Sequence, residues 1–313
     1  MQLRAYLILA VMPLFFVSNL ILGRPAVESV PPWTLAALRW LIVSALLAPF
    51  VWPTVKRHAA AIRAEWRAIL LLGFLGMWLC GGLVYLSLRY TTATNGTLIY
   101  TTSPVIVVLL AAILARKPLP FLQAIGVTLG VLGVFTVVLK GDLSSLLQLR
   151  LNMGDLGFVI ATIAWSVYSL ILKRKRLQTI PIAALFFLIA LSGAILLIPF
   201  MAIELAQGEA FPVTGRAWSS IGGIVLFASL LSFSTYQYGV KTVGPAVTSV
   251  FMYLLPCYGV ALAALFLGED LHAYHAAGLA LVMLGIVMAS GAGLRDMIAR
   301  RRQPAPVKAR RRR

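Results

Sequence analysis

The sequence predicts an all-α polytopic membrane protein, with ten transmembrane helices in two inverted five-helix repeats around a central cavity and both termini in the cytoplasm. Three observations support this prediction: the composition, the length of the apolar runs, and the recurrence of marker residues half a chain apart. Of the 313 residues, 61% are hydrophobic and 12% are charged, and the mean hydropathy is +0.94. These values lie far outside the range of soluble domains, so we expect the bilayer to be the environment of the chain.

Ten apolar runs have about the 20 residues that a helix needs to cross a bilayer. Little of the chain lies outside them, so we expect no soluble catalytic domain, and any function must reside in the membrane bundle. The first run is longer than the apolar part of a secretory signal, and we interpret it as a retained helix. The runs span residues 5–23, 33–52, 68–88, 96–115, 120–140, 154–172, 181–202, 219–239, 246–267 and 272–293.

Basic residues are distributed unevenly between alternate connections. With the N-terminus in the cytoplasm, the inner side holds 21 of the 27 Lys and Arg residues, including the run KRKR at 173–176 and nine from Arg295 onward. The positive-inside rule therefore places both termini in the cytoplasm. We expect the tail at 295–313 to be disordered and to lie against anionic lipid headgroups, and we expect no nucleic-acid partner.

Marker residues of the first half recur in the second half. Because each half has five crossings, the second copy enters the membrane in the opposite orientation, and such inverted repeats can expose one central site alternately to each side. We assign the first repeat to residues 1–144 and the second to residues 145–294. The matched pairs are Trp66 and Trp218, Arg89 and Lys241, Pro104 and Pro256, Gly126 and Gly278, and Gly133 and Gly285 at an offset of 152 residues, and Phe16 and Trp165, Arg24 and Lys173, and Pro32 and Pro181 at an offset of 149.

Five stretches carry a family resemblance: LFFVSNLILGR, LAALRW, LRYTTATNGTLIYTTSPVIVVLLAAIL, IAWSVYSLILKR and VKTVGPAVTSVFMYLLPCYGVALAALFLGEDL. They resemble the ten-helix branch of the drug/metabolite transporter superfamily, which has two EamA-type halves. Within it the chain is most similar to bacterial aromatic amino-acid exporters of the YddG type. The resemblance implies a basket of ten helices. Helices 1, 3, 4, 6, 8 and 9 would surround a central cavity, and helices 5 and 10 would lie outside it.

Aromatic residues recur at helical spacing in the run at 68–88. Phe74, Trp78, Gly81 or Gly82, and Tyr85 follow one another at spacings of three or four residues, which places them on one helix face. We expect Trp78 and Tyr85 to form an apolar slot for a substrate. The alternative is that these rings only pack the bundle.

Two prolines interrupt apolar runs at equivalent positions. Pro104 follows Tyr100 and Ser103, and Pro256 follows Ser249 and Tyr253. A proline leaves the carbonyl one turn earlier without its helical partner, and neighbouring hydroxyls, water or a ligand can bind that carbonyl. We expect the prolines to bend their helices and shape the gate, and the four neighbouring residues to contact substrate. The alternative is that the hydroxyls only satisfy the kinked backbone.

The first helix of each half carries further candidates. Phe16 and Asn19 share a face in the first run, and Trp165 and Tyr168 lie on a similar face in the run at 154–172. We expect all four to contact substrate. For Asn19 the alternative is an interhelical hydrogen bond, worth about 0.6 kcal/mol, and for Trp165 it is filling of the core.

Arg39 is the one unambiguous charge within an apolar run. A lipid-facing arginine near the bilayer centre is costly, so this side chain must face a cavity or reach an interface. We expect it to snorkel toward the outer interface. The alternatives are a gating contact or a contact with a substrate carboxylate.

The nine acidic residues all lie in loops or at helix ends, so no carboxylate is expected at the bilayer midplane. We therefore predict a facilitator, or uniporter, without proton coupling. Coupling through His272 or His275 is the alternative. Cys80 and Cys257 lie in separate runs without metal-ligand spacing, so we expect no metal and no cofactor.

Together these observations favour an alternating-access exporter of small amphipathic metabolites, with aromatic or hydrophobic amino acids as the first expected substrates. Other amino acids, purine-like metabolites or drugs are alternative substrates, and a channel is the alternative class. No enzyme motif occurs, so we do not expect an enzyme. We expect a multi-pass protein of the bacterial inner membrane that contacts lipid and a small-molecule substrate. A monomer is expected, with a homodimer as the alternative.

Glycines at 126, 130 and 133 favour close helix packing.

Overall fold

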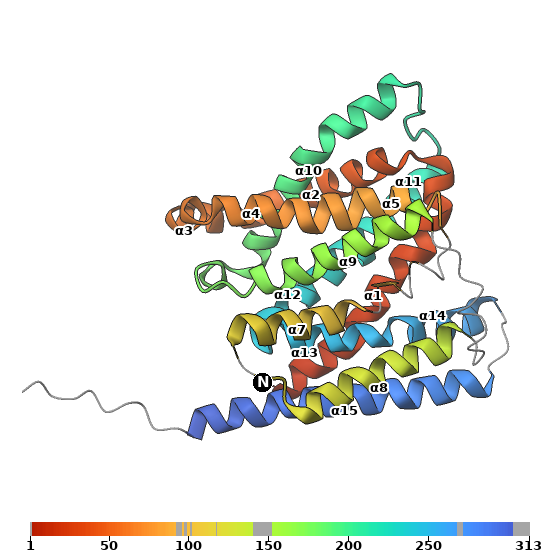
Figure 1. Ribbon diagram of the computed structural model, residues 1–313. Helices are drawn as coiled ribbons and strands as arrows, with labels where there is room; N and C mark the ends of the chain where they lie inside the picture. The colour runs from red at the N-terminus through yellow and green to blue at the C-terminus, as the bar shows by residue number, and fades with distance from the viewer. Residues whose placement is uncertain are drawn as a thin grey trace, which may run out of the picture.

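The computed structural model describes residues 2–91, 96, 99–100, 102–116, 118–139, 152–267 and 272–302. All regular secondary structure within these ranges is helical (Figure 1). The first half contains α1 (Gln2–Ser29), α2 (Pro32–Arg57), α3 (Ala59–Ala64), α4 (Trp66–Gly73), η1 (Phe74–Leu83), α5 (Val84–Ser87), α7 (Ser103–Ala115) and α8 (Phe121–Val138). The second half contains α9 (Met153–Ile171), η3 (Leu177–Thr179), α10 (Ile182–Ala206), α11 (Gly215–Gly223), η4 (Ile224–Leu231), α12 (Ser232–Thr242), α13 (Pro245–Val250), η5 (Phe251–Tyr253), α14 (Leu254–Leu267) and α15 (Ala273–Arg302).

Each of the ten predicted apolar runs overlaps a described helix, so the prediction of an all-helical chain with many apolar segments is confirmed. Among the described residues, five helical segments are long and apolar enough to cross a membrane, by length and composition. They are Pro32–Arg57, Trp66–Ser87, Met153–Ile171, Ile182–Ala206 and Gly215–Thr242. Shorter apolar helices cover Leu3–Asn19, Ser103–Ala115, Phe121–Val137 and Ala273–Ala289. The number of crossings stays a prediction, and the boundary at 144/145 lies outside the described residues.

Local sequence explains where several helices begin. Pro32 is the first residue of α2, a position where the missing N–H of proline has no helical partner in any case. At the start of α9, the Asn152 side chain accepts hydrogen bonds from the N–H groups of Gly154 (2.8 Å) and Asp155 (3.1 Å). The Asp155 carboxylate accepts one from the N–H of Asn152 (2.8 Å), which completes a capping box.

The two halves of the chain are interleaved. Helices α2 and α10 pack together at one edge of the bundle, and α8 and α15 pack together at the opposite edge (Figure 1). Between these pairs, α1 packs on η4, α12 and α14, while α9 packs on η1, α5 and α7. Every one of these contacts joins a helix of the first half to a helix of the second half.

The glycines of α8 fit closely against α15. A Cβ atom on Gly126 would overlap the backbone of Ala289, and one on Gly133 would lie 2.7 Å from the carbonyl oxygen of Gly278. Gly285 faces Gly126 and Gly130 from the other helix. The predicted small-residue face therefore packs within one chain, where backbones approach closely, and these glycines are not available for a dimer seam.

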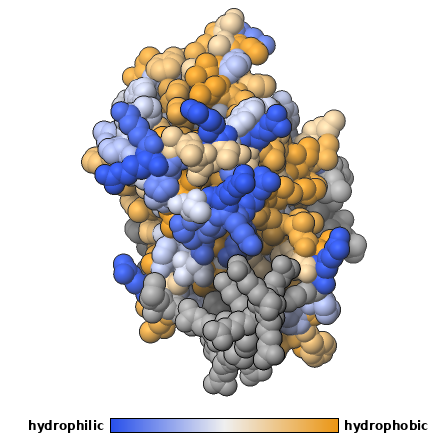
Figure 2. All heavy atoms as spheres, turned by 90° about the vertical axis from the view of Figure 1, so that its left-hand side faces the viewer, coloured by the Kyte–Doolittle hydropathy of each residue, from blue (hydrophilic) through white to orange (hydrophobic). Residues whose placement is uncertain are grey.

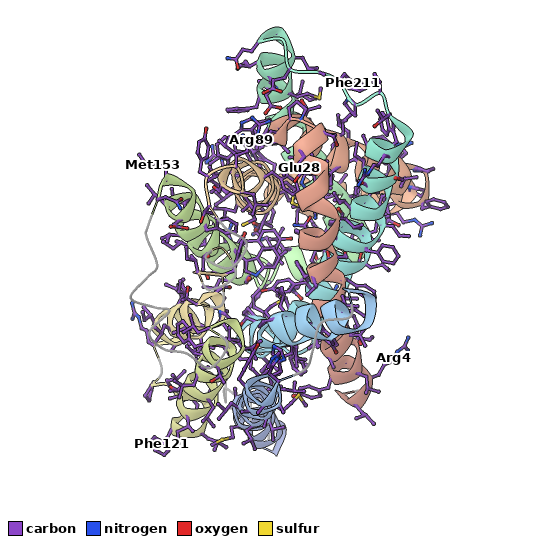
Figure 3. The ribbon with its side chains drawn as sticks, turned by 90° about the vertical axis from the view of Figure 1, so that its right-hand side faces the viewer. Arg4, Glu28, Arg89, Phe121, Met153 and Phe211 are labelled. Carbon is purple, nitrogen blue, oxygen red and sulfur yellow. The ribbon has the colours of Figure 1, made fainter. Side chains whose placement is uncertain are left out.

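Hydrophilic residues cover one end of the bundle (Figure 2). The connections after α2 and after α9 lie together at one end, where Arg174 forms an ion pair with Glu65 at 3.3 Å. Figure 2 looks onto this end, and hydrophilic residues gather over it. Figure 3 looks onto the opposite end, where Glu28 belongs to the last turn of α1 and Met153 begins α9. Connections that the sequence assigns to the cytoplasmic side therefore share one end.

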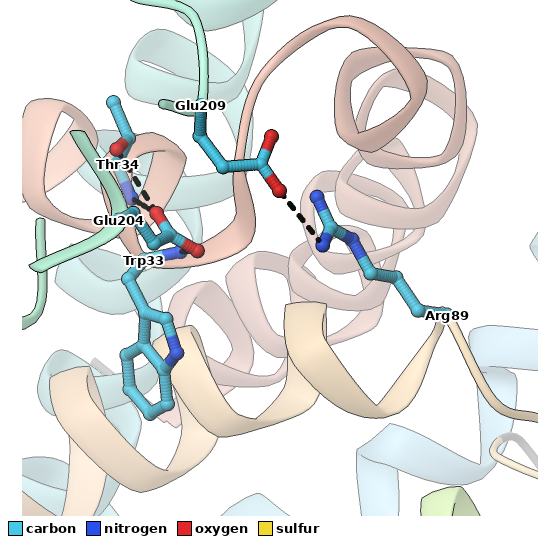
Figure 4. A network of polar contacts seen from close by, with 5 residues as sticks. All are labelled: Trp33, Thr34, Arg89, Glu204 and Glu209. Atoms are coloured by element: carbon cyan, nitrogen blue, oxygen red, sulfur yellow. Dashed lines mark hydrogen bonds and ion pairs between the residues drawn. The ribbon is translucent and has the colours of Figure 1, made fainter. Parts of the chain in front are cut away.

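A carboxylate of α10 holds the start of α2 (Figure 4). Glu204 accepts hydrogen bonds from the backbone N–H groups of Trp33 (3.1 Å) and Thr34 (2.7 Å), and from the Thr34 hydroxyl (3.0 Å). The first N–H groups of a helix have no partner within the helix, and the helix dipole favours a negative charge beside them. Arg89 and Glu209 form an exposed ion pair at 3.5 Å nearby.

The last helix extends further than the sequence predicted. The last predicted apolar run ends at residue 293, and α15 continues to Arg302. Disorder of the tail at 295–313 stays a prediction. The segment LRDMIARRR consists largely of strong helix formers and precedes Pro304, the first residue that breaks a helix. Residues 303–313 lie outside the described residues.

Candidate functional site

A pocket opens between the two halves of the bundle. It contains about 940 Å³ of empty space, including its open mouth. A mostly apolar concavity with a few polar groups is typical of small-molecule sites. Its lining residues come from α1, α2, η1, α5, α7 and the segment before α7 in the first half, and from α9, η4, α12, η5 and α14 in the second half. They are Phe16, Asn19, Arg39, Cys80, Val84, Gly96, Tyr100, Ser103, Pro104, Phe158, Trp165, Ala228, Phe233, Met252 and Leu255.

Arg39 places a positive charge at this pocket. Its side chain is buried, with 3% of its surface exposed, and it donates four hydrogen bonds to three helical segments. The guanidinium also lies 4.5 Å from the centroid of the Trp40 ring, close enough for a cation–π interaction. The four acceptors are the Ser229 hydroxyl (2.6 Å), the Asn19 side-chain oxygen (3.2 Å), the Tyr85 hydroxyl (2.8 Å) and the Ala228 carbonyl (2.5 Å).

The expectation that Arg39 snorkels to the outer interface is therefore wrong. The reason is that α1, α5 and η4 supply enough acceptors to hold the guanidinium inside the bundle, where its N–H groups would otherwise require water. Two of these acceptors, Ala228 and Ser229, belong to the second half of the chain. Arg39 thus links the two halves at the pocket.

No acidic residue neutralises Arg39 within the described part of the chain. Its acceptors are all uncharged, and the described lining of the pocket contains no Asp or Glu. The ion pairs found among the described residues are Arg89 with Glu209 and Arg174 with Glu65. The guanidinium is hydrogen-bonded, but its charge has no counter-ion there.

Asn19 is oriented by its neighbours. Its side-chain oxygen accepts hydrogen bonds from both the Tyr85 hydroxyl (2.7 Å) and Arg39 (3.2 Å). Because both partners donate, the oxygen of the amide must face them, and the amide nitrogen points elsewhere. Asn19 therefore makes the interhelical hydrogen bonds that were the alternative for it, and it also lines the pocket, while its contact with substrate stays a prediction.

An aromatic wall forms one side of the pocket. The Phe16 ring lies 5.7 Å from Trp165 in an edge-to-face arrangement and 5.8 Å from Phe233. Trp165 contacts Phe233 edge-to-face at 5.5 Å and Tyr236 at 4.6 Å. These distances are typical of favourable ring pairs. Phe16 and Trp165, which are equivalent residues of the two halves, therefore contact each other in the pocket wall.

The segment around Pro104 contributes a second side. Tyr100, Ser103 and Pro104 all line the pocket, and Tyr100 packs edge-to-face on Phe158 at 5.5 Å. The Ser103 hydroxyl is buried and has no hydrogen-bond partner among the described residues. Pro104 lies in the first turn of α7 and cannot donate to the carbonyl of Tyr100, four residues earlier.

The helix around Pro256 is interrupted as predicted, but the residues that precede this proline do not all face the pocket. The 3₁₀ turn η5 separates α13 from α14 just before Pro256, whose missing N–H cannot reach the carbonyl of the pocket residue Met252. Ser249 bonds the backbone of Ala246 at 3.0 Å, and the buried Tyr253 ring packs against Gly130 of α8. Neither Ser249 nor Tyr253 lines the pocket.

Three other candidates lie beside or away from the pocket. Tyr85 lies beside the pocket and forms hydrogen bonds with two of its lining residues, Arg39 and Asn19. Tyr168 is fully buried behind Trp165, with ring centroids 5.2 Å apart, and its hydroxyl accepts a hydrogen bond from Gln237 at 3.2 Å. Trp78 packs with Trp33, Phe74 and Phe200 in a separate cluster between α2, η1 and α10.

Two π-helices, η1 and η4, explain why α-helical spacing did not predict which side chains share a face. In a π-helix each N–H bonds to the carbonyl five residues earlier, so the helix turns less per residue than an α-helix. Trp78 and Tyr85 therefore do not share a face, and Cys80 and Phe233, which the sequence analysis did not select, reach the pocket. At the offset of 152 residues Phe74 corresponds to Leu226, inside η4, so both halves carry this feature.

Some pocket residues gave no signal in the sequence. Phe158, Val84 and Leu255 are of the types that also face lipid, so composition could not distinguish them. Ser229 could have been identified from the sequence, because a hydroxyl in an apolar run needs a hydrogen-bond partner. In the structure that partner is Arg39. Within the described ranges, no group of three or more His, Cys, Asp or Glu side chains could hold a metal ion.

Comparisons with known proteins agree with this architecture. A crystal structure of a protein superposes with a TM-score of 0.74, covering 93% of this chain and 98% of that chain at 20% identity, which shows the fold alone. The uncharacterized transporter YyaM of Bacillus subtilis is 24% identical over 290 residues, covering 93% of this chain and 94% of that protein. The uncharacterized transporter YetK of the same organism is 27% identical over 285 residues, covering 91% and 86%.

A further relative is the uncharacterized inner membrane transporter YedA of Escherichia coli K12, which is 23% identical over 266 residues, covering 85% of this chain and 83% of that protein. The model of the EamA-like transporter family matches the chain twice, at residues 3–139 and 152–291. The two matches cover most of the chain, and residues from both matched regions line the pocket described above. The chain therefore belongs to the EamA-like transporter family and is a membrane transporter.

Proposed function

We propose that this chain is an alternating-access exporter of small amphipathic metabolites in the bacterial inner membrane, with aromatic or hydrophobic amino acids as its first substrates. The observation that carries the proposal is the pocket lined by residues of both family matches, with the polar side chains of Asn19 and Arg39 and the rings of Trp165 and Phe233 in its lining. A site shared by two halves can change its accessibility when the halves move against each other.

The packing of the halves supports an inverted repeat with ten crossings and cytoplasmic termini. Helix α1 packs on η4, α12 and α14, and its counterpart α9 packs on η1, α5 and α7. The pairs α2 with α10 and α8 with α15 join equivalent helices. Reciprocal contacts of this kind are those that a twofold axis produces. The Lys- and Arg-rich connections after α2 and after α9 lie together at one end of the bundle, which supports the predicted orientation.

The chemistry of the pocket favours a facilitator over a proton-coupled carrier. A proton-coupled site needs a group that exchanges a proton during the cycle, usually a carboxylate or a histidine in the membrane. The described lining of the pocket contains neither. Substrate exported along its own gradient is the function that this set of side chains supports best.

The interrupted helices support a gating role for Pro104 and Pro256. Each proline lies in the first turn of a new helical segment, α7 or α14, and in each case a pocket residue, Tyr100 or Met252, lies one turn earlier. Segments joined at such points can rotate with few hydrogen bonds lost. Aromatic amino-acid exporters of the YddG type provide the precedent from which we take the first substrate.

Counterflow in proteoliposomes tests this proposal. Vesicles loaded with unlabelled phenylalanine, threonine or a nucleoside receive the same labelled compound outside, with and without a pH gradient. We expect transient, saturable accumulation of phenylalanine that is independent of the gradient. Uptake that does not saturate indicates a channel, strict dependence on the gradient contradicts uniport, and accumulation of threonine or the nucleoside alone contradicts the aromatic substrate.

A further inference from the structure

We infer that Arg39 binds the carboxylate of the substrate, and that the pocket recognises small aromatic carboxylates whether or not they carry an ammonium group. The inference rests on the proposed function, because it narrows the substrate class of the same pocket. It combines three observations: an uncompensated buried charge, unused hydrogen-bond donors beside it, and an aromatic wall.

The first observation is the charge of Arg39. The guanidinium is 3% exposed and is surrounded by uncharged acceptors in the described part of the chain. A buried charge without a counter-ion is costly, and an anion placed against it is attracted more strongly than in water because the surroundings are of low dielectric constant. A ligand that brings a carboxylate completes an ion pair that the described protein residues leave incomplete.

The second observation is the set of free donors. Of the five N–H groups of an arginine, four have acceptors here, and the remaining one is on Nη2. The Asn19 amide nitrogen carries two more, since its oxygen already faces Tyr85 and Arg39. The buried Ser103 hydroxyl lines the same pocket without a partner among the described residues. All three residues line the same pocket, so a carboxylate bound there has hydrogen-bond donors available to it.

The acceptors needed by an ammonium group are largely occupied. The Asn19 oxygen accepts from Tyr85 and Arg39, and the Ala228 carbonyl accepts from Arg39 and from the Ser232 hydroxyl. The described lining offers no carboxylate, and the nearby guanidinium repels a second positive charge. Recognition therefore depends on the carboxylate, and the ammonium of an amino acid adds little to binding.

The third observation is the shape of the apolar part. Phe16, Trp165 and Phe233 form one wall, and Tyr100, which precedes α7, adds a second ring pair with Phe158 of α9. Aromatic rings prefer edge-to-face or offset contacts with other rings. A ligand that joins a carboxylate to a phenyl ring matches a pocket whose lining combines Arg39 and Asn19 with these rings.

A ligand series on the unaltered protein tests this inference without depending on the folding of a variant. Three compounds of similar shape differ only in their charged groups: phenylalanine has both, 3-phenylpropanoate lacks the ammonium, and phenethylamine lacks the carboxylate. Each competes with labelled phenylalanine in counterflow. We expect 3-phenylpropanoate to compete within about threefold of phenylalanine, and phenethylamine to be weaker by at least about tenfold, the factor that one lost charge-assisted hydrogen bond produces.

Variants then connect the carboxylate to Arg39. Arg39→Gln keeps some hydrogen bonds but removes the charge, and Arg39→Lys keeps the charge without the planar donor array. Arg89→Gln is the matched control, because it removes a positive charge from an exposed ion pair outside the pocket. In Arg39→Gln we expect the preference for 3-phenylpropanoate over phenethylamine to disappear, with an intermediate preference in Arg39→Lys and the full preference in Arg89→Gln.

The possible failures are distinguishable. If all three compounds compete equally, or phenethylamine competes best, the carboxylate inference is wrong while the proposed transport of aromatic amino acids stands. If 3-phenylpropanoate is weaker than phenylalanine by tenfold or more, the ammonium is required and the inference is wrong in that respect. If phenylalanine itself shows no counterflow, the proposed substrate fails, and the inference fails with it. An unchanged preference in Arg39→Gln assigns Arg39 to structure alone and overturns its role in binding.

Discussion

Replacing Glu204 by alanine tests how α2 is held against α10. Glu204 is 8% exposed, and its carboxylate accepts three hydrogen bonds from the first turn of α2 (Figure 4). The variant leaves the N–H groups of Trp33 and Thr34 without an acceptor at a helix start, and it removes a negative charge from the positive end of the helix dipole.

The cost of this change follows from the two backbone groups. A buried donor left unpaired costs about 1 to 3 kcal/mol, and loss of a side-chain cap costs about 0.5 to 2 kcal/mol in other helices. Because both N–H groups bond the same carboxylate, we expect the free energy of unfolding to fall by about 2 to 4 kcal/mol in total, rather than by the sum of the separate costs. At about 2 to 4 °C per kcal/mol for chains of 150–250 residues, this corresponds to a melting temperature lower by roughly 4 to 16 °C.

The assay is thermal unfolding of the detergent-solubilised protein at a fixed heating rate, because membrane proteins of this size often unfold irreversibly. Glu209→Ala is the matched control, since it removes a carboxylate from an ion pair whose side chains are 37% and 44% exposed. An exposed pair contributes about 0 to 1 kcal/mol, so the control should shift the melting temperature by at most about 4 °C. Equal, small shifts in both variants would refute the capping role of Glu204.

Further predictions concern packing, the gate and the pocket. Gly126→Ala should separate α8 from α15 and lower the melting temperature by several degrees, whereas Gly222→Ala, where nothing lies within 4 Å, should not; equal effects would contradict the described helix contact. Pro104→Ala and Pro256→Ala should change the rate of counterflow more than the order of substrate preference, and a change in preference alone would count against gating. Ser103→Ala should weaken competition by 3-phenylpropanoate by about 2- to 10-fold, the effect of one hydrogen bond, without lowering stability, because its hydroxyl has no partner among the described residues.

The helical architecture could be predicted from sequence because each apolar run is long enough to satisfy its own backbone within the bilayer. Phe16 and Trp165 were selected from the sequence as equivalent residues of the two halves, and both line the pocket, with their rings 5.7 Å apart. Interruptions before Pro104 and Pro256 also followed from the chemistry of proline. These features depend on composition and local covalent structure, which the sequence states directly.

The sequence did not reveal features that depend on helix geometry or on distant partners. The π-helical segments η1 and η4 change which side chains share a face, so Trp78 was placed with Tyr85 when it lies with Trp33 and Phe200 instead. Arg39 was expected at the outer interface because the sequence does not show that Ser229, 190 residues later, accepts its hydrogen bond. Both cases require knowledge of the packed bundle.

Accessibility of the pocket from the two sides of the membrane tests the central claim of alternating access. The chain has two cysteines, so Cys80→Ser and Cys257→Ser give a cysteine-free background. In this background Met252→Cys places a thiol on the pocket wall. A membrane-impermeant thiol reagent is then added to right-side-out and to inverted vesicles. We predict labelling from both sides, with phenylalanine slowing it in each orientation. Labelling from one side only, unaffected by substrate, would contradict the account.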